Sequence, residues 1–217
     1  MIRLYLALVF FVLATQQGVS QVNKTNVSEF ERQLYVRLNL LGLADVLDHN
    51  LSTGIEYRFH PHWSTGTDAG WIFASSYLTT NKGANGLLVR PFIRFYPDKD
   101  GIGFFEAELH YKYVAYRMED WLGRLPVNGV ATYQEFTKFN YNKNAAGAHI
   151  KGGLQTEMNR NKTLLFDFTG GIGVRWKSQG VKDGIYNEQG GGITDIFNPA
   201  YSGPVVLLNM RLLYRIR

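Results

Sequence analysis

Residues 208–217 read Leu-Asn-Met-Arg-Leu-Leu-Tyr-Arg-Ile-Arg, and apolar and polar side chains alternate along them. The even-numbered positions hold the apolar residues Leu208, Met210, Leu212, Tyr214 and Ile216, and the odd-numbered positions hold the polar residues Asn209, Arg211, Arg215 and Arg217. We refer to each such set of alternate positions as a parity. Successive side chains of a β-strand point to opposite faces of the sheet. The segment therefore predicts a strand with one apolar face and one ionic face.

The same alternation recurs along the chain and predicts an all-β protein. The predicted strands span residues 34–41, 51–60, 63–73, 87–96, 104–116, 145–157, 163–177 and 205–217. The turns predicted after the second, fourth and sixth strands are short, whereas residues 74–86, 117–144 and 178–203 form long loops. This asymmetry is typical of transmembrane β-barrels, so we expect an eight-stranded antiparallel up-and-down barrel.

The N-terminal residues indicate export. Arg3 precedes an apolar run at residues 4–14, and small residues stand one and three positions before a cut between Ser20 and Gln21. This arrangement predicts a signal peptide at 1–20 that is cleaved near Ser20. The apolar run is too short to span a bilayer, which needs about 20 residues. We expect a polar leader at 21–33 and the barrel at 34–217. The mean hydropathy of −0.17 argues against a helical membrane protein.

Charge and cysteine usage exclude two classes of protein. The formal net charge is +5, but Lys and Arg occur singly at alternate strand positions and form no basic run. This distribution argues against a nucleic-acid partner. The chain has no cysteine, which argues against a small secreted domain held together by disulfides.

Alternation alone does not decide which face points inward, because a soluble secreted carrier would place its apolar face inside. The interior of an eight-stranded barrel is just wide enough for side chains, so it cannot hold so many large apolar groups. Large aromatic side chains cluster near strand ends, where membrane barrels carry aromatic girdles. The predicted girdle comprises Phe59, Trp63, Phe95, Phe105, Trp176 and Tyr214. We therefore expect the apolar face to meet lipid.

The opposite parity predicts a charged lumen in which acidic and basic side chains pair. The expected network comprises Arg37, Glu56, Arg58, Asp68, Arg90, Arg94, Glu106, Glu108, Lys112, Lys151, Glu157, Asp167, Arg175, Arg211 and Arg215. Pairing is expected because an isolated charge in a confined interior is costly.

Four short motifs carry a resemblance to known proteins. They are Arg37-Leu-Asn-Leu-Leu41, Gly54-Ile-Glu-Tyr-Arg-Phe59 with Trp63-Ser64, Arg90-Pro-Phe-Ile-Arg-Phe-Tyr96, and Gly170-Gly-Ile-Gly-Val174. Through them the chain resembles a family of uncharacterised bacterial outer-membrane β-barrel proteins, similar to small eight-stranded barrels of the OmpA/OmpW type. The resemblance implies the outer membrane of a Gram-negative-type cell and supplies no catalytic residues.

The resemblance also implies two partners, outer-membrane lipid and the barrel-insertion machinery, which reads the last strand. Asn209, Tyr214 and Ile216 fit the usual C-terminal assembly signal, whereas Arg211 stands where that signal has glycine and Arg217 is an additional residue. Residues 117–144 and 178–203, as external loops, are the expected contact surface for an extracellular ligand.

Several residue clusters are candidates for chemistry. Glu106, Glu108 and His110 share a face, and His60 and His62 flank a proline. The pair His49 and Ser52, which lacks a third partner, and Gly190-Gly191-Gly192, which lacks a strand–loop–helix context, are weaker candidates.

None of these clusters outweighs its structural interpretation, so we expect no catalytic residue, cofactor or metal. The predicted function is a structural or surface-binding role in the outer membrane. The alternatives are a narrow channel for small or apolar solutes and a lipid-modifying enzyme.

Overall fold

The computed structural model describes residues 31–43, 48–76, 81–98, 102–128, 130–181, 184–186 and 202–216. The predicted signal peptide at 1–20, most of the leader at 21–33, most of the loop at 178–203 and Arg217 lie outside the described residues.

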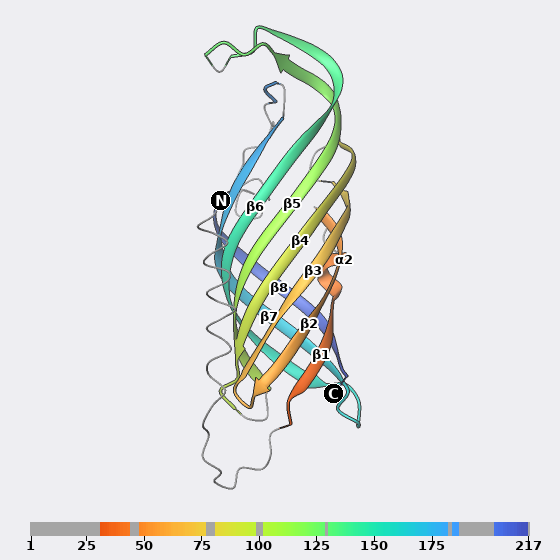
Figure 1. The fold of residues 1–217 in the computed structure, drawn as a ribbon, viewed down its shortest axis with the longest axis vertical. Helices are drawn as coiled ribbons and strands as arrows, with labels where there is room; N and C mark the ends of the chain where they lie inside the picture. Colours follow the sequence, from red (N-terminus) through yellow and green to blue (C-terminus); the bar gives the residue numbers. More distant parts are fainter. Residues whose placement is uncertain are drawn as a thin grey trace. The chain divides into compact units, whose positions relative to one another are not determined.

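Eight antiparallel strands in the described residues follow one another around a closed barrel in chain order. They are β1 (Gln33–Asn39), β2 (Asp48–His60), β3 (Trp63–Ser75), β4 (Asn81–Phe95), β5 (Gly103–Arg124), β6 (Tyr133–Glu157), β7 (Leu164–Val181) and β8 (Gly203–Arg215). A single helical turn, α2 (Leu40–Leu43), follows β1, and β8 pairs with β1 to close the ring (Figure 1). The predicted eight-stranded up-and-down topology is confirmed.

The strands are strongly inclined to the barrel axis. A path that starts at Tyr35 of β1 and steps from each residue to its ladder partner on the next strand ends at Val205 of β8. Tyr35 itself pairs with Arg215, ten residues farther along β8 than Val205. With a rise of about 3.3 Å per residue and a strand spacing of about 4.8 Å, this stagger gives a tilt of about 40°.

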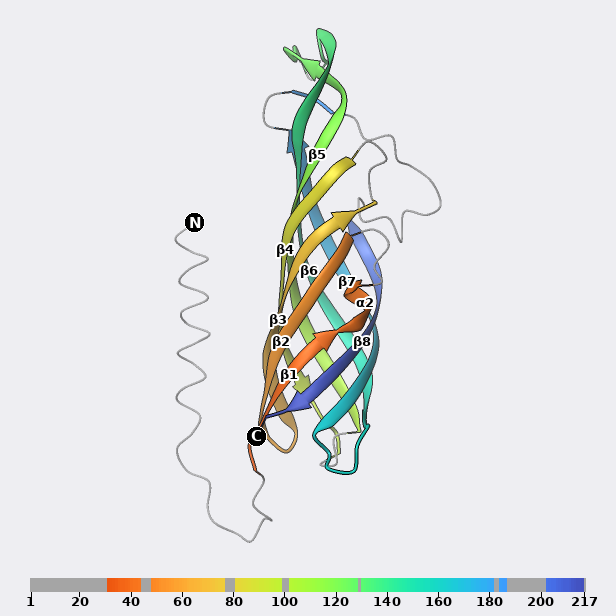
Figure 2. The same ribbon diagram turned by 90° about the vertical axis from the view of Figure 1, so that its right-hand side faces the viewer.

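The prediction of a long loop at residues 117–144 is wrong. β5 continues to Arg124 and β6 begins at Tyr133, and the two strands pair along their whole length. Their ends extend beyond both neighbouring strands, since β4 pairs with β5 only as far as Met118 (Figures 1 and 2). In this two-stranded ladder each strand is hydrogen-bonded along one edge, which pairs about half of its backbone donors and acceptors. The predicted loop at 74–86 is also shorter, because β4 begins at Asn81.

Side chains alternate between interior and exterior along the part of each described strand that forms the barrel wall. Arg94 and Arg211 are fully buried, whereas Leu208 on the opposite parity is 62% exposed. The charged parity therefore faces the interior and the apolar parity faces outward, in the predicted orientation.

Aromatic side chains form two bands on the outer face. One band lies at the end with the short turns and contains Phe59, Trp63, Phe95, Phe105 and Tyr214, all exposed. The other contains Trp71, Phe73, Tyr111, Tyr113 and Trp176, so Trp176 lies in the second band rather than beside the other predicted girdle residues. Trp63 and Phe73 stand ten residues apart on β3, which places the bands about 25 Å apart along the tilted axis.

The outer face between the two bands carries no Asp, Glu, Lys or Arg on any described strand. Charge returns to this face only beyond the second band, at Arg117 and Glu119 of β5 and Lys138 of β6. The outer surface is thus divided into an apolar belt and a polar extension made by the β5–β6 hairpin.

The barrel wall is incomplete above β1. β1 ends at Asn39, which pairs with Ser52 of β2 and Arg211 of β8. Both neighbours continue past it, β2 through residues 48–51 and β8 through residues 203–210, and neither has a β1 partner there. α2 contacts both strands and lies at this gap (Figure 2).

Gly66 on β3 makes room for an interior aromatic ring. A Cβ at this position would lie 2.1 Å from the carbonyl oxygen of Ile55 and 2.6 Å from the Phe92 ring. We expect Gly66→Ala to lower the free energy of unfolding by about 1–3 kcal/mol, because the backbone or ring must shift. Urea unfolding in detergent micelles measures this. Gly152→Ala on the outer face, where a Cβ meets nothing within 4 Å, is the control, and equal stabilities would contradict the prediction.

Candidate functional site

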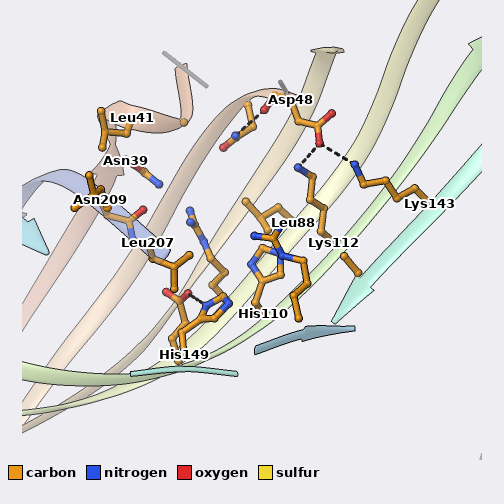
Figure 3. A pocket seen from close by; sticks show the side chains of 17 residues that line it. Asn39, Leu41, Asp48, Leu88, His110, Lys112, Lys143, His149, Leu207 and Asn209 are labelled. Carbon is orange, nitrogen blue, oxygen red and sulfur yellow. Dashed lines mark hydrogen bonds and ion pairs between the residues drawn. The ribbon is translucent and has the colours of Figure 1, made fainter. Parts of the chain in front are cut away.

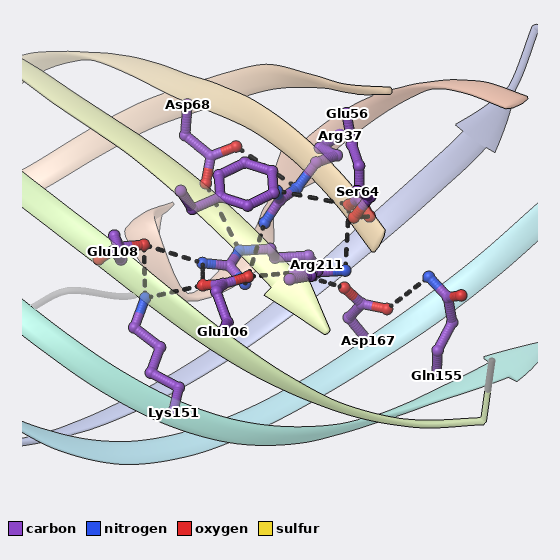
Figure 4. A network of polar contacts seen from close by, with 12 residues as sticks. Arg37, Glu56, Ser64, Asp68, Glu106, Glu108, Lys151, Gln155, Asp167 and Arg211 are labelled. Carbon is purple, nitrogen blue, oxygen red and sulfur yellow. Dashed lines mark hydrogen bonds and ion pairs between the residues drawn. The ribbon is translucent and has the colours of Figure 1, made fainter. Parts of the chain in front are cut away.

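A layer of ionic side chains crosses the interior of the barrel in its lower half, toward the short turns. Every strand contributes to this layer (Figure 4). Its members are Arg37, Glu56, Asp68, Arg94, Glu106, Glu108, Lys151, Asp167 and Arg211, and all of them are buried. We refer to these nine residues as the ionic layer.

Arg94 is the hub of the ionic layer. Its guanidinium lies 3.0 Å from Glu56, 2.6 Å from Glu106 and 2.7 Å from Asp167. It also stacks on the Phe104 ring at 4.0 Å, as Arg37 does on Phe92 at 3.9 Å. A planar guanidinium suits this role because it donates several hydrogen bonds in its plane while its face packs on an aromatic ring.

Glu106 gathers the remaining cations. Besides Arg94, its carboxylate lies 3.1 Å from Lys151 and 3.2 Å from Arg211. Neutral partners complete the layer: Tyr96 and Ser64 donate to Glu56 at 2.7 and 2.6 Å, and Gln155 donates to Asp167 at 3.0 Å. These contacts link strands that do not pair with each other, so the layer ties the wall together across the interior.

Nine of the predicted lumen residues form the ionic layer, and the other six lie elsewhere. Arg58 stacks on Tyr96 at 4.2 Å, and Arg215 lies over the Tyr35 ring at 5.6 Å. Lys112 belongs to a second cluster, and Arg90 and Arg175 line a cavity. The placement of Glu157 in the lumen is wrong: β6 ends there, and its exposed side chain pairs with Lys162 at 3.2 Å.

A cavity of about 310 Å³ occupies the interior on the far side of the ionic layer from the short turns (Figure 3). Its walls come from β1, α2, β2, β4, β5, β6, β7 and β8, and the lining includes Asn39, Asp48, Arg90, His110, His149, Arg175 and Leu208. We refer to it as the upper cavity.

Asp48 heads a second ionic cluster at the rim of the upper cavity. Its carboxylate pairs with Lys112 and with Lys143 at 3.5 Å, and it accepts hydrogen bonds from Tyr116 at 3.1 Å and Ser75 at 2.6 Å. Sequence reasoning missed Asp48 and Lys143, because both were assigned to loops. Extending the alternation backward from His149 through Gly147 and Ala145 would have reached Lys143, but small side chains concealed the period.

Three groups in the upper cavity resemble a metal-binding set. One ligand atom each from Glu108, His110 and His149 lies within 4.8 Å of the others. His149 Nδ1 lies 3.0 Å from Glu108 Oε1, an arrangement that often orients histidine ligands. However, the other Glu108 oxygen contacts Lys151 and Arg211, and two arginines line the same cavity, which disfavours a cation. Sequence reasoning grouped Glu106, Glu108 and His110, and the structure replaces Glu106 with His149.

The remaining candidate clusters have structural explanations. His62 lies 2.7 Å from the backbone oxygen of Tyr96, and His60 accepts from the His62 backbone at 3.2 Å, as expected of a tight turn. Ser52 donates to Asn50 at 2.6 Å, and the His49 ring faces Phe73. Gly190-Gly191-Gly192 lies outside the described residues.

Together the fold and interior define a class of protein: an eight-stranded antiparallel barrel with an apolar exterior, an ionic layer and a basic cavity. Comparison of the chain with protein-family models, curated proteins and solved structures found no match. No helix in the described part of the chain combines the length and apolar character of a membrane-spanning helix.

Proposed function

We propose that the chain is an integral β-barrel of the outer membrane of a Gram-negative-type cell, with a binding role at the cell surface. The observation that carries this proposal is the apolar belt between the two aromatic bands. Its height of about 25 Å matches the apolar band of transmembrane β-barrels, and the strand tilt of about 40° falls in their range.

The cost of exposing the apolar belt to water supports a membrane location over a soluble barrel. A soluble monomer rarely exposes a contiguous apolar patch larger than a few hundred Å². Here exposed leucine, isoleucine, valine and aromatic side chains occur on every strand of the belt. In a bilayer the same side chains would meet hydrocarbon, whereas the charged groups would remain paired inside the barrel.

The ionic layer argues for a binding protein rather than a channel. Arg94, Arg211 and Glu106 lie at the centre of the interior, and each is almost completely buried. Eight strands leave little space beyond that taken by the side chains themselves. We infer that the layer closes the barrel to ions, and planar-bilayer recordings are expected to show no steady conductance.

The β5–β6 hairpin supplies the surface for an external partner. It projects beyond the apolar belt, and its outer face there carries Arg117, Glu119 and Lys138. Its tip exposes Trp121 and Phe136, whose rings pack at 5.6 Å, together with Leu125. Exposed aromatic side chains of this kind are enriched in protein–protein contacts.

Membrane fractionation and gel mobility test the proposal. The protein expressed in a Gram-negative host is expected to remain in the outer-membrane fraction after carbonate extraction. Its unheated form should migrate differently from the boiled form, because a closed barrel resists unfolding by detergent. Equal migration, together with recovery in the soluble fraction without detergent, would refute the proposed membrane location. A known outer-membrane barrel of the host is the control for both assays.

A further inference from the structure

The upper cavity carries more positive charge than negative charge. Its lining includes the cations Arg90, Lys112, Lys143 and Arg175 and the anions Asp48 and Glu108, a formal excess of two positive charges without the histidines. Both carboxylates are already engaged, Asp48 by the two lysines and Glu108 by Lys151 and Arg211. The arginines at the wall therefore give the upper cavity its positive charge.

Arg90 is the side chain in the upper cavity that most requires a ligand. It is only 8% exposed, yet its Nε and Nη2 atoms have no hydrogen-bond partner among the described residues. No carboxylate in the described part of the chain lies within ion-pairing distance of it. A guanidinium is always charged and can only donate, so only an acceptor can satisfy these atoms.

His149 adds a second unsatisfied group in the same cavity. Its side chain is almost fully buried, its Nδ1 is occupied by Glu108 and its Nε2 has no partner among the described residues. The His110 ring lies 5.4 Å from the His149 ring and also lines the cavity. Arg90, His110, His149 and Arg175 come from β4, β5, β6 and β7, so basic groups line the cavity along four consecutive strands.

The upper cavity reaches the barrel wall where the wall is incomplete. Leu208 belongs to the outward parity of β8 and is exposed, and it also lines the cavity. It lies in the part of β8 that has no β1 partner. Leu41 and Gly42 of α2 line the cavity at the same gap (Figure 3 labels Leu41). The cavity therefore lies closest to the outer face of the barrel at this gap, beside α2.

We propose that the upper cavity binds a phosphate group, with Arg90 as its principal donor and Arg175, His110 and His149 around it. A phosphate monoester carries nearly two negative charges at neutral pH and three acceptor oxygens, which matches the excess charge and the unsatisfied Arg90 donors. His149, whose Nδ1 donates to Glu108, adds a donor at Nε2 in its imidazolium form. The phosphate can belong to a soluble phosphate ester or to a lipid headgroup that enters through the lateral gap. The lipid source rests on the proposed membrane location, whereas the site itself does not.

Calorimetric titration of the folded full chain in octyl glucoside tests the site. The soluble ligands are inorganic phosphate and glycerol 3-phosphate, and the lipid ligand is phosphatidic acid, with phosphatidylcholine as its comparison. We expect Arg90→Gln to weaken phosphate binding by about tenfold or more, because a charge-assisted pair is lost. Arg160→Gln, which removes an exposed arginine from the short turn between β6 and β7, is the matched control. Tighter binding of phosphatidic acid than of the soluble phosphates identifies the lipid source, and the reverse identifies the soluble one.

Unheated gel mobility establishes that each variant is folded, and Arg175→Gln replaces Arg90→Gln if the latter does not fold. Absence of phosphate binding by the folded wild type, or equal affinity of Arg90→Gln and wild type, would overturn the proposal. So would Zn²⁺ binding that is lost in His149→Ala while phosphate has no effect, since this would assign the cavity to a metal. Phosphate binding by a protein that needs no detergent would leave the site standing and refute only the membrane location.

Discussion

Arg94→Met is expected to lower the free energy of unfolding by about 3–5 kcal/mol, the cost of removing one partner from a buried ionic network. Methionine retains much of the packing against Phe104 but cannot neutralise the carboxylates. Arg94 contacts Glu56, Glu106 and Asp167, and no other cation in the described residues lies within 4.0 Å of Asp167. Three buried carboxylates therefore lose a partner, and Asp167 keeps no ion pair among the described residues.

Equilibrium urea unfolding in detergent micelles, followed by tryptophan fluorescence, measures this loss. The matched control is Arg124→Met, which removes an arginine from the partly exposed pair with Glu135 on the β5–β6 hairpin. A surface pair contributes about 0–1 kcal/mol, so the control should remain close to the wild type. Similar losses in the two variants would show that the ionic layer is not a buried network.

Ile150→Arg is expected to destabilise the protein in phospholipid bilayers by about 2–4 kcal/mol, the cost of placing arginine near the bilayer midplane. Ile150 is 69% exposed on the outer face of β6, midway between the two aromatic bands. An exposed substitution of this kind would cost a soluble barrel little, since surface changes rarely exceed about 0.5 kcal/mol. The variant therefore separates the membrane proposal from a soluble alternative.

Folding into bilayers at a series of urea concentrations, assayed by gel mobility, provides the measurement. Asn140→Arg lies on the same strand and the same face but beyond the second aromatic band, so it should cost little. If Ile150→Arg folds as stably as Asn140→Arg, the outer face does not meet hydrocarbon and the proposed location is wrong.

Much of the fold followed from local patterns. The alternation at residues 208–217 predicted the inward face of Arg211 and the outward face of Leu208, because strand geometry alone relates neighbouring side chains. The β5–β6 extension was missed because its polarity is reversed relative to the barrel, with the apolar Met118 and Leu122 on the inner parity and the charged Arg117 and Glu119 on the outer. A hairpin beyond the barrel lies outside the apolar belt, so its outer face does not have to stay free of charge.

The candidate site was predicted only in part. The sequence identified all nine members of the ionic layer by parity, but it did not show that Arg94 is their hub or that Glu157 lies outside. It also placed Arg90 among paired charges, whereas the structure sets it at the wall of the upper cavity without an ion pair among the described residues. Parity gives the face of a side chain, and its partners depend on the stagger between strands.

The sequence by itself determined that the strands of this chain each have an apolar face and an ionic face, because a period of two residues is a property of each strand alone. Tertiary structure decided which charges meet, where β1 stops and where a cavity remains. The stagger of ten residues sets which side chains share a level of the interior, and that stagger is a property of the closed ring that no single strand encodes.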